Sequence, residues 1–398
     1  MFAKAFVGSR NYYLWLTLLF AAIGAGTICY LIQYFQGLGV TGMSRDVTWG
    51  FYIAQFTFLV GVAASAVMVV LPYYLHNYKQ FGKITVLGEF LAVASVIMCC
   101  LFIFVDLGQP LRVMNVIFHP TPNSVMFWDM CVLQGYLLLN IVIAWVSLDS
   151  ERNGIAPPKW IKPFVYLSIP WAVSIHTVTA FLICGLPGRH FWLTAIMAPR
   201  FLASAFAAGP ALLIILCLVL RRLTKFDAGK EAIQKLAVVV LYAMIVNVFF
   251  FLLEVFTAFY SGIPGHKHAL EYLLFGLHDH NMLTPYIWLA AVLAFVSIFT
   301  LLKPSLRRNE TLLGWACAGI FIASWIDKGL CLIVAGFVPT PMETITEYNP
   351  TFIELTISIG VYAIGALILT LFYKVAVTVK EEVAGKKPQT AVADEASA

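Results

Sequence analysis

Ten apolar stretches, each long enough to cross a lipid bilayer, constrain this sequence more than any other feature. A membrane-spanning helix needs about 20 predominantly apolar residues, and runs of this length follow one another along the chain. They lie near residues 13–34, 51–75, 84–105, 126–148, 163–186, 201–220, 236–260, 283–302, 312–336 and 352–376. Because lipid cannot satisfy backbone polar groups, long apolar runs predict helices. We therefore predict an all-α integral membrane protein with ten transmembrane helices.

The composition excludes the other common classes of protein. Of the 398 residues, 61% are apolar and 11% are charged, whereas soluble domains have about 45–50% apolar and about 25% charged residues. So few charges cannot cover a soluble surface of this size, which excludes a soluble enzyme, a disordered chain and a nucleic-acid-binding protein. An outer-membrane barrel is excluded because its strands are short segments of alternating hydrophobicity.

The distribution of Lys and Arg predicts the orientation in the membrane. Cytoplasmic loops of membrane proteins carry an excess of these residues. Nineteen of the 25 fall on one side of the predicted spans, five fall on the other side, and Lys328 lies inside a span. The five are Arg45, Arg112, Arg189, Arg200 and Lys267. We predict cytoplasmic termini, one ten-span domain over residues 1–383 and a cytoplasmic tail over residues 384–398.

The cysteines and histidines do not indicate a resident cofactor. The eight cysteines contain no CxxC pair, and buried cysteines in apolar spans are usually small hydrophobes. Of the eight histidines, only His176 lies deep inside a predicted span. The outer-loop histidines His266, His268, His278 and His280 could in principle bind a metal, but loop histidines are more often solvated. We expect no haem, no iron–sulfur cluster and no metal site in this chain.

Ionisable residues within the predicted spans indicate where function lies. Such residues cost about 2.5–3.5 kcal/mol each on insertion scales, so each needs a reason. They are Glu89, Asp106, Asp129, His176, Glu254, Asp327, Lys328 and Glu354. The carboxylates at span ends could be helix caps, and Lys328 could pair with Glu254 or Glu354. Most of the set falls in the outer half of the membrane, which predicts a polar cavity on that side.

Two motifs resemble those of a known family. The segments Asp106-Leu-Gly-Gln-Pro-Leu-Arg112 and Ser124-Val-Met-Phe-Trp128 are similar to the signature of the NrfD/polysulfide-reductase membrane subunit family. That signature reads roughly Asp-Leu-Gly-Arg/Lys-Pro-x-Arg, then Ser-Pro-Met-Ser-Trp. The departures from it are Gln109, Val125 and Phe127. Residues 41–75 resemble the ten-span branch of the family, especially the DsrP type found in DsrMKJOP complexes.

The resemblance implies a fold of two four-helix bundles, here spans 2–5 at about 51–186 and spans 6–9 at about 201–336, flanked by spans 1 and 10. It implies a haem-free subunit of a prokaryotic cytoplasmic (inner) membrane that exchanges electrons between menaquinol or menaquinone and a partner. That partner would be a ferredoxin-like iron–sulfur subunit of the DsrO type on the periplasmic face. Further redox subunits of the DsrMKJ type and a link to sulfite or sulfur metabolism are implied as well.

Quinol chemistry then suggests roles for individual residues. Oxidation of a quinol releases two protons and two electrons, so the site needs a proton acceptor within hydrogen-bond reach of the quinol oxygens. We predict His176 and Asp129 as this pair. The quinone-binding residues would be Tyr52, Gln55, Asp106, Arg112 and Trp128, with Asp106 and Arg112 paired to shape the outer loop.

Proton translocation is an additional hypothesis, and it would use a second set of residues. The predicted proton pathway consists of Glu89, Glu254, Asp327 and Lys328. Two other functions stay open at this point. Ten spans with intramembrane charges also suit a secondary transporter, and a purely structural membrane anchor would need none of these roles.

Overall fold

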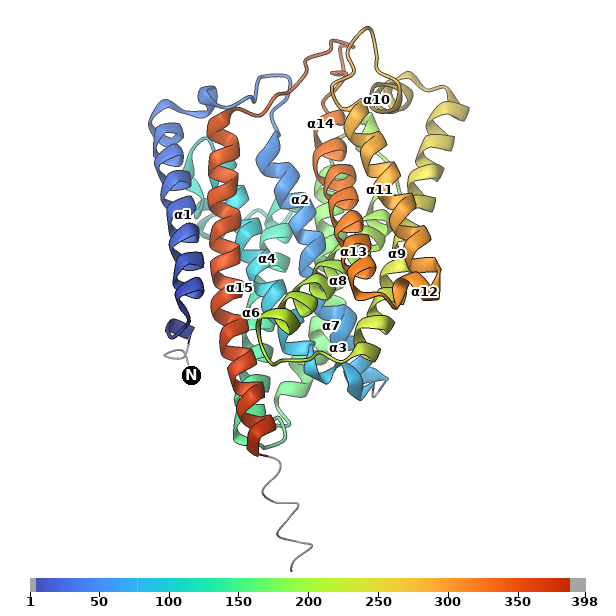
Figure 1. The fold of residues 1–398 in the computed structure, drawn as a ribbon. Helices are drawn as coiled ribbons and strands as arrows, with labels where there is room; N and C mark the ends of the chain where they lie inside the picture. The colour runs from blue at the N-terminus through green and yellow to red at the C-terminus, as the bar shows by residue number, and fades with distance from the viewer. Residues whose placement is uncertain (1–4, 77, 387–398) are drawn as a thin grey trace, which may run out of the picture.

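The computed structural model describes residues 5–76 and 78–386, and these residues form a helical membrane protein (Figure 1). Ten of the helical segments are long and apolar enough to cross a membrane, which confirms the predicted number. No β-strand occurs within those two ranges. The helices are α1 (Arg10–Gln36), α2 (Phe51–Ala63), α3 (Ser65–Leu75), α4 (Thr85–Asp106), α5 (Asn115–Phe118), α6 (Val125–Asn153), α7 (Ile161–Cys184), α8 (Met197–Leu223), α9 (Lys230–Ser261), α10 (Pro264–Leu274), α11 (Thr284–Leu302), α12 (Pro304–Arg307), α13 (Glu310–Ser324), α14 (Leu332–Ala335) and α15 (Phe352–Lys386).

The apolar stretches identify the spans, but several helices extend beyond them. Helix α9 begins at Lys230 and α15 continues to Lys386, because polar helical turns can project past the hydrocarbon into the interface. The start of α1 and the end of α15 lie at the same end of the molecule (Figure 1). The rest of the predicted tail, residues 387–398, lies outside the described residues.

The helices of the first half contact one another in a ring, and so do those of the second half. Helices α4 and α6 are neighbours, α6 packs against α7, and α2 with α3 contacts both α4 and α7. In the second half, α9 lies between α8 and α11, and α13 closes the ring by packing against α11 and α8. The two halves meet where α2 contacts α8. The division into two four-helix bundles remains a prediction.

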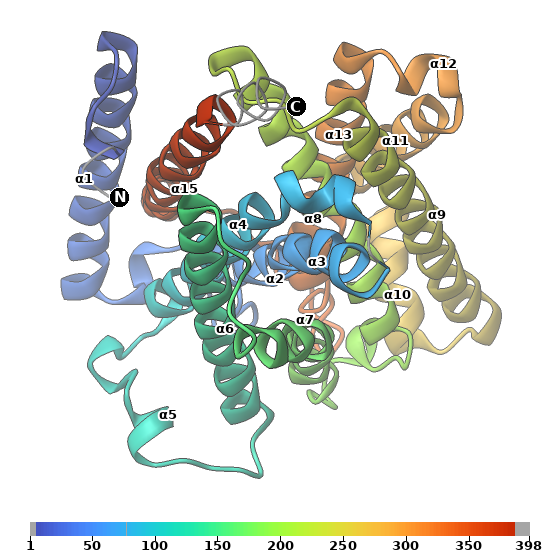
Figure 2. The ribbon, with the colours of Figure 1, turned by 90° about the horizontal axis from the view of Figure 1, so that it is seen from below.

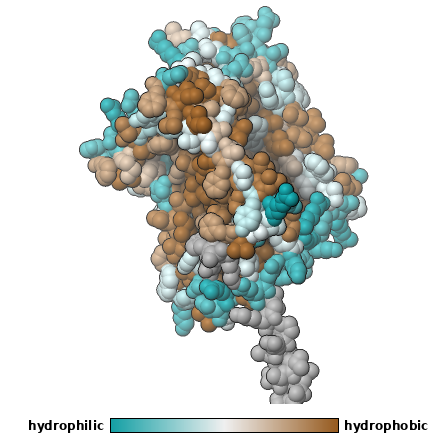
Figure 3. All heavy atoms as spheres, turned by 60° about the vertical axis from the view of Figure 1, so that its left-hand side comes forward, coloured by the Kyte–Doolittle hydropathy of each residue, from teal (hydrophilic) through white to brown (hydrophobic). Residues whose placement is uncertain are grey.

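The first and last spans lie outside these rings. Helix α1 packs mainly against α15, and α15 in turn packs against α4 (Figure 2). In the most apolar part of α1 only 11% of the residues are buried, compared with 94% in the span formed by α2 and α3. An apolar surface band lies between polar regions above and below it (Figure 3). The second span is therefore the centre of the fold, and the first span is exposed to lipid.

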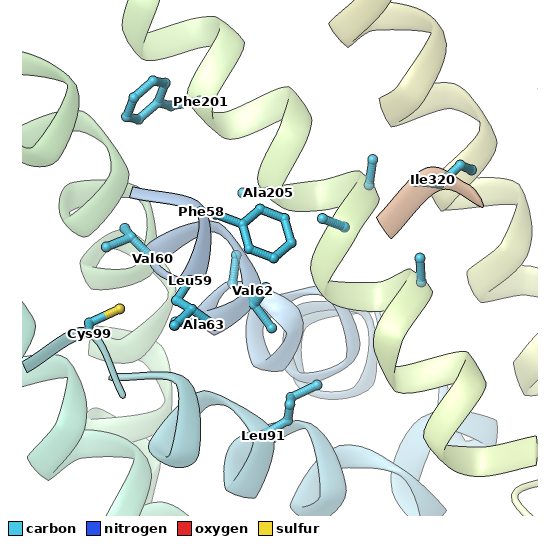
Figure 4. Packing of buried hydrophobic residues seen from close by; sticks show 14 of the residues in the cluster. Phe58, Leu59, Val60, Val62, Ala63, Leu91, Cys99, Phe201, Ala205 and Ile320 are labelled. Atoms are coloured by element: carbon cyan, nitrogen blue, oxygen red, sulfur yellow. The ribbon is translucent and has the colours of Figure 1, made fainter. Parts of the chain in front are cut away.

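The core around α2 is built from small and aromatic side chains. Figure 4 shows Phe58, Leu59, Val62 and Ala63 of α2 close to residues of neighbouring helices. Phe58 stacks edge-to-face on Phe321 of α13, with ring centroids 5.0 Å apart. Small residues allow close helix packing in membranes, where the hydrophobic effect does not drive helices together.

Two of the ten spans are irregular near the centre of the molecule. The second span is interrupted at Ala64, between α2 and α3. The ninth span contains a π-helical segment, Trp325–Cys331, between α13 and α14. This π-helical segment contacts α2. Because π-helical turns frequently occur at functional sites, the contact between these two spans is a natural place to look for one.

Candidate functional site

The predicted proton-handling pair lies on two adjacent helices of the first half. Asp129 is in the second turn of α6, and His176 is on α7, and both are buried. Thr179 follows His176 by three residues, so the two side chains lie on the same face of α7. The Thr179 hydroxyl donates a hydrogen bond to Asp129 Oδ1 (2.6 Å). Asp129 therefore faces the side of α7 that carries His176.

His176 has no hydrogen-bond partner in the described part of the chain. Both ring nitrogens are buried and unpaired, and no direct hydrogen bond joins them to Asp129 there. A buried polar group without a partner loses its hydration and gains nothing in return. Such a group is well suited to bind a polar ligand atom or a water molecule in the assembled protein.

Tyr52 and Gln55, two of the predicted quinone-binding residues, lie on α2 and make hydrogen bonds with other helices. The Tyr52 hydroxyl donates to Gln33 Oε1 of α1 (2.7 Å), and Gln33 Nε2 donates to the Val105 carbonyl of α4 (2.6 Å). The oxygen of Gln55 accepts hydrogen bonds from Trp325 and Tyr362. Both residues are buried, and their hydrogen bonds connect α2 to the first, ninth and tenth spans.

Asp106, Arg112 and Trp128 lie at the end of α4, in the loop that follows it and at the start of α6. No ion pair forms between Asp106 and Arg112 within residues 5–76 and 78–386, so that expectation is wrong: Arg112 is exposed, and Asp106 is partly buried at the end of α4. Trp128 is 51% exposed, and its indole N–H donates to the Pro122 carbonyl (2.8 Å). None of the three side chains hydrogen-bonds to His176, both of whose ring nitrogens lack a partner among the described residues.

The second half contains a buried ion-pair cluster centred on Arg200. Arg200, on the fourth residue of α8, bonds Glu254 of α9 and also Asp327 of the π-helical segment, the latter at 2.5 Å. Arg200 was predicted to lie in an outer loop, and this prediction is wrong because α8 begins at Met197. The cluster thus joins three helices of one half through a single guanidinium group.

Lys328 does not form the ion pair that was expected of it. Glu254 bonds Arg200, and Glu354 accepts hydrogen bonds from the Gly42 N–H (2.6 Å) and the Tyr348 hydroxyl (2.6 Å). Among the described residues the Lys328 Nζ has no hydrogen-bond partner, and it lies 4.2 Å from the centroid of the Phe201 ring.

Glu354 has a structural role at the start of α15. Thr351 and Glu354 form a reciprocal capping box, in which the Thr351 N–H donates to Glu354 Oε2 (3.0 Å) and the Glu354 N–H donates to the Thr351 hydroxyl (3.4 Å). The same carboxylate holds the outer loops through Gly42 and Tyr348. This is the helix-cap alternative that the sequence left open.

Glu89 is the remaining member of the predicted proton pathway. It lies in the first half of the protein, whereas the cluster around Arg200 lies in the second half. It is buried on α4, and its Oε2 has no hydrogen-bond partner in the described ranges. Lys380 on α15 pairs with Glu151 near the end of α6 (2.7 Å). The structure does not connect Glu89 to Glu254 through hydrogen bonds.

Three of the four outer-loop histidines lie beside another side chain. His268 Nδ1 lies 2.8 Å from Glu343, His280 Nδ1 lies 3.3 Å from Glu347, and the rings of His266 and His190 are 6.3 Å apart. In the part of the chain that is described, no three His, Cys, Asp or Glu side chains are grouped in a way that could hold a metal ion.

The fold and these groups define a class of protein: a helical membrane protein of ten spans with buried charges between its helices. The chain belongs to the polysulphide reductase NrfD family, whose model matches residues 39–341. It is a multi-pass integral protein of a prokaryotic cytoplasmic membrane, as predicted.

Curated relatives match along nearly the whole chain. A putative membrane subunit of a dimethyl sulfoxide reductase from Halobacterium salinarum is 25% identical, covering 88% of this chain and 87% of the relative. An Hdr-like menaquinol oxidoreductase integral membrane subunit from Archaeoglobus fulgidus is 23% identical, covering 95% and 96%. The integral membrane subunit of a menaquinone reductase from Nitratidesulfovibrio vulgaris is 21% identical, covering 92% and 91%.

Proposed function

We propose that this protein is the quinone-reactive membrane subunit of a multisubunit respiratory redox complex. Membership of the NrfD family supports this, as do two relatives whose names include menaquinol oxidoreductase and menaquinone reductase. The observation that carries the proposal is the buried group on α6 and α7, in which Asp129 and Thr179 are hydrogen-bonded and His176 has both ring nitrogens free.

This group can supply what quinol oxidation requires. A bound quinol loses two electrons and two protons as it becomes the quinone. The imidazole of His176 and the carboxylate of Asp129 accept the protons, because both are basic groups on facing helices. The Thr179 hydroxyl orients Asp129. The electrons leave to a partner subunit of the complex.

The finer assignment follows from the motifs. The segments 106–112 and 124–128 and the ten-span architecture favour a DsrP-type subunit that uses menaquinone as an exchangeable carrier. Its partners would be a DsrO-like iron–sulfur subunit on the periplasmic face and further subunits of the DsrMKJ type, in a complex linked to sulfite or sulfur metabolism. Purification of the native complex followed by identification of its subunits and extracted quinones tests this assignment.

Proton translocation is the second part of the proposal. The supporting observation is a series of buried charges in the second half. Lys328 follows Asp327 in the chain and is buried against the ring of Phe201, and Asp327 pairs with Arg200. Glu254 extends the series through Arg200. Glu89 would serve the cytoplasmic side. Acidification measured on proteoliposomes that contain the complex, with and without Lys328→Met, tests this part.

Variants of the α6–α7 group test the quinone assignment. In the assembled complex, Asp129→Asn and His176→Ala should abolish quinol-dependent electron transfer. Thr179→Val, which keeps the shape but removes the donor to Asp129, should reduce turnover about 10- to 150-fold, because a hydrogen bond to a charged group is worth about 1.5–3 kcal/mol.

The matched control for these variants is Thr177→Val. The Thr177 hydroxyl bonds only the Val173 carbonyl of its own helix (2.9 Å) and is partly exposed, so this variant should retain turnover. Full turnover in Asp129→Asn and His176→Ala, with assembly intact, would remove these residues from the site. A protein that purifies alone, without redox partners, would instead favour the secondary transporter, which the interrupted span at Ala64 also suits.

A further inference from the structure

A cavity of about 380 Å³ lies between α2, the ninth span and α15, away from Asp129 and His176. Aromatic side chains form much of its wall: Phe51, Phe321, Trp325 and Tyr362. None of its lining residues belongs to α6 or α7. It is therefore a separate place from the proton-handling group.

The cavity opens toward the lipid. Three residues of its rim are exposed on the membrane-facing sides of α13 and α15: Ile322 (43%), Leu355 (39%) and Ile359 (58%). Gln55 also lines the cavity and is fully buried. Gln55 forms the floor of the cavity. A molecule dissolved in the bilayer could reach it by passing between α13 and α15, without crossing the aqueous loops.

The floor carries one hydrogen-bond donor that is not in use. Gln55 Oε1 accepts from the indole N–H of Trp325 (2.6 Å) and from the Tyr362 hydroxyl (2.6 Å). Because an indole nitrogen can only donate, this contact fixes which end of the amide is oxygen. Gln55 Nε2 is then a buried donor without a partner in the described ranges.

The other polar residue of the cavity does not compete for this donor. The Ser358 hydroxyl donates to the Glu354 carbonyl of its own helix (2.8 Å). A ligand that completes the cavity must therefore be apolar and flat enough for aromatic walls, and it must present a hydrogen-bond acceptor to Gln55. A quinone ring has these properties, since its carbonyl oxygens accept hydrogen bonds and its faces are apolar.

We propose that this cavity is a docking station on the lipid side, where the ring of a quinone binds with a carbonyl oxygen accepting a hydrogen bond from Gln55 Nε2. The inference rests on the proposed function, because that function supplies the carrier. The docking station would be a second quinone-binding site, bounded by the ninth and tenth spans, in addition to the group on α6 and α7. A phospholipid ester carbonyl has similar acceptor chemistry, so the experiment must separate the two ligands.

The test is photolabelling of the purified complex in lipid nanodiscs with an azido derivative of a menaquinone, followed by identification of the labelled peptides. Label is expected in residues 51–63, 321–325 and 355–362. Ile359→Trp, which fills the mouth of the cavity and alters no polar group, should reduce this label about tenfold. Gln55→Leu should reduce it about fivefold, the effect of one hydrogen bond.

Val296→Trp is the matched control, because Val296 is exposed on α11 (61%) and outside the cavity. It should label like the unmodified complex. Label confined to α6 and α7, or insensitive to Ile359→Trp, would overturn the docking station and leave the proposed function standing. Equal labelling of the same peptides by a photoreactive phospholipid would also overturn it. Absence of quinone label anywhere, together with absence of quinol-dependent turnover, would instead reject the proposed function.

Discussion

At the scale of single residues, Arg200 shows how this protein keeps carboxylates inside a membrane. Two carboxylates on different helices share one guanidinium group, whose planar fork can bond both at once. Removing one partner of a buried ion pair typically costs about 3–5 kcal/mol, because the remaining charge stays buried without compensation. Loss of Arg200 alone should thus destabilise the second half, because it leaves two buried carboxylates without a counter-charge.

Substitution of Arg200 should therefore destabilise the protein strongly. We expect Arg200→Met to lower the thermal unfolding midpoint of the purified protein, because Glu254 and Asp327 lose their counter-charge. Adding Glu254→Gln and Asp327→Asn to the same chain should restore much of the loss, since no uncompensated charge is left. The measurement is unfolding followed by a thiol-reactive dye or by aggregation. An unchanged midpoint in the single variant would mean that the ion pairs contribute nothing.

Residue roles were only partly predictable from the sequence. Burial of His176 and Asp129 follows from their position within apolar runs, and both are buried. The partner of Asp129 is Thr179, which has no distinguishing sequence signal. Arg200 could have been found by asking which cation balances the carboxylates of the seventh and ninth spans, but its place at the edge of a predicted span hid it.

At the scale of helices, the contact between the first and last spans depends on two glycines. A Cβ atom built on Gly26 of α1 would lie 2.8 Å from the Cα of Gly360 on α15. Close approach of helix backbones in membranes requires small residues at the crossing point. The lack of side chains at this crossing therefore permits the close approach of α1 to α15, and the hydrogen bonds of Gln33 with Tyr52 and Val105 also hold α1 in place.

A larger residue at this crossing should detach α1. We expect Gly360→Leu to separate α1 from α15 and to expose the interface to protease or thiol reagents, with the remaining nine spans still folded. Gly24→Leu is the control, since nothing lies within 4 Å of a Cβ at Gly24. The readout is disulfide crosslinking between cysteines placed on α1 and α15. Equal crosslinking in both variants would contradict the proposed role of the glycines.

The outer cap formed by α10 and the loop before α15 should weaken in acid. Burial and the nearby His190 lower the pKa of His266 below its usual 6.5. Partial burial opposes ionisation of Glu347, but the Met282 N–H and His280 outweigh it and lower the pKa of Glu347. A lowered pKa in the folded state means that the unfolded segment binds protons first, so stability falls as the pH falls.

We therefore expect hydrogen exchange of residues 263–283, corrected for intrinsic rates, to be slower at pH 7 than at pH 5. The effect of His266 begins below about pH 6.5, and that of Glu347 follows below about pH 4.5. His266→Asn should reduce the pH dependence, whereas His119→Asn, on an exposed loop, should leave it unchanged. Equal protection at both pH values would contradict the assignment.

At the scale of the whole molecule, the orientation in the membrane is the main prediction that the structure leaves untested. With Arg200 inside α8, four of the Lys and Arg residues remain in the outer loops, and the asymmetry is preserved. Both described chain ends lie at the same end of the molecule (Figure 1). The charge distribution assigns that end to the cytoplasm.

Cysteine accessibility tests the orientation. We expect Arg45→Cys to react with a membrane-impermeant thiol reagent in spheroplasts and Lys303→Cys to react only after the membrane is opened, since both positions are exposed on opposite sides. The unmodified chain, which has eight native cysteines, provides the background. The opposite pattern would reverse the orientation and move the α6–α7 group to the cytoplasmic side.

The sequence alone was sufficient for the class of protein, the number of spans and the family. Lipid selects helices by length and composition, and both are local properties of the chain that can be read without knowing the fold. The tertiary structure decided which buried groups meet: Arg200 with Glu254 and Asp327, Lys328 against Phe201, and Gln55 at the floor of a cavity. The reason is physical, because spans that are apolar on all sides carry no marker of which face turns inward, so only packing sets each helix's rotation and its partners.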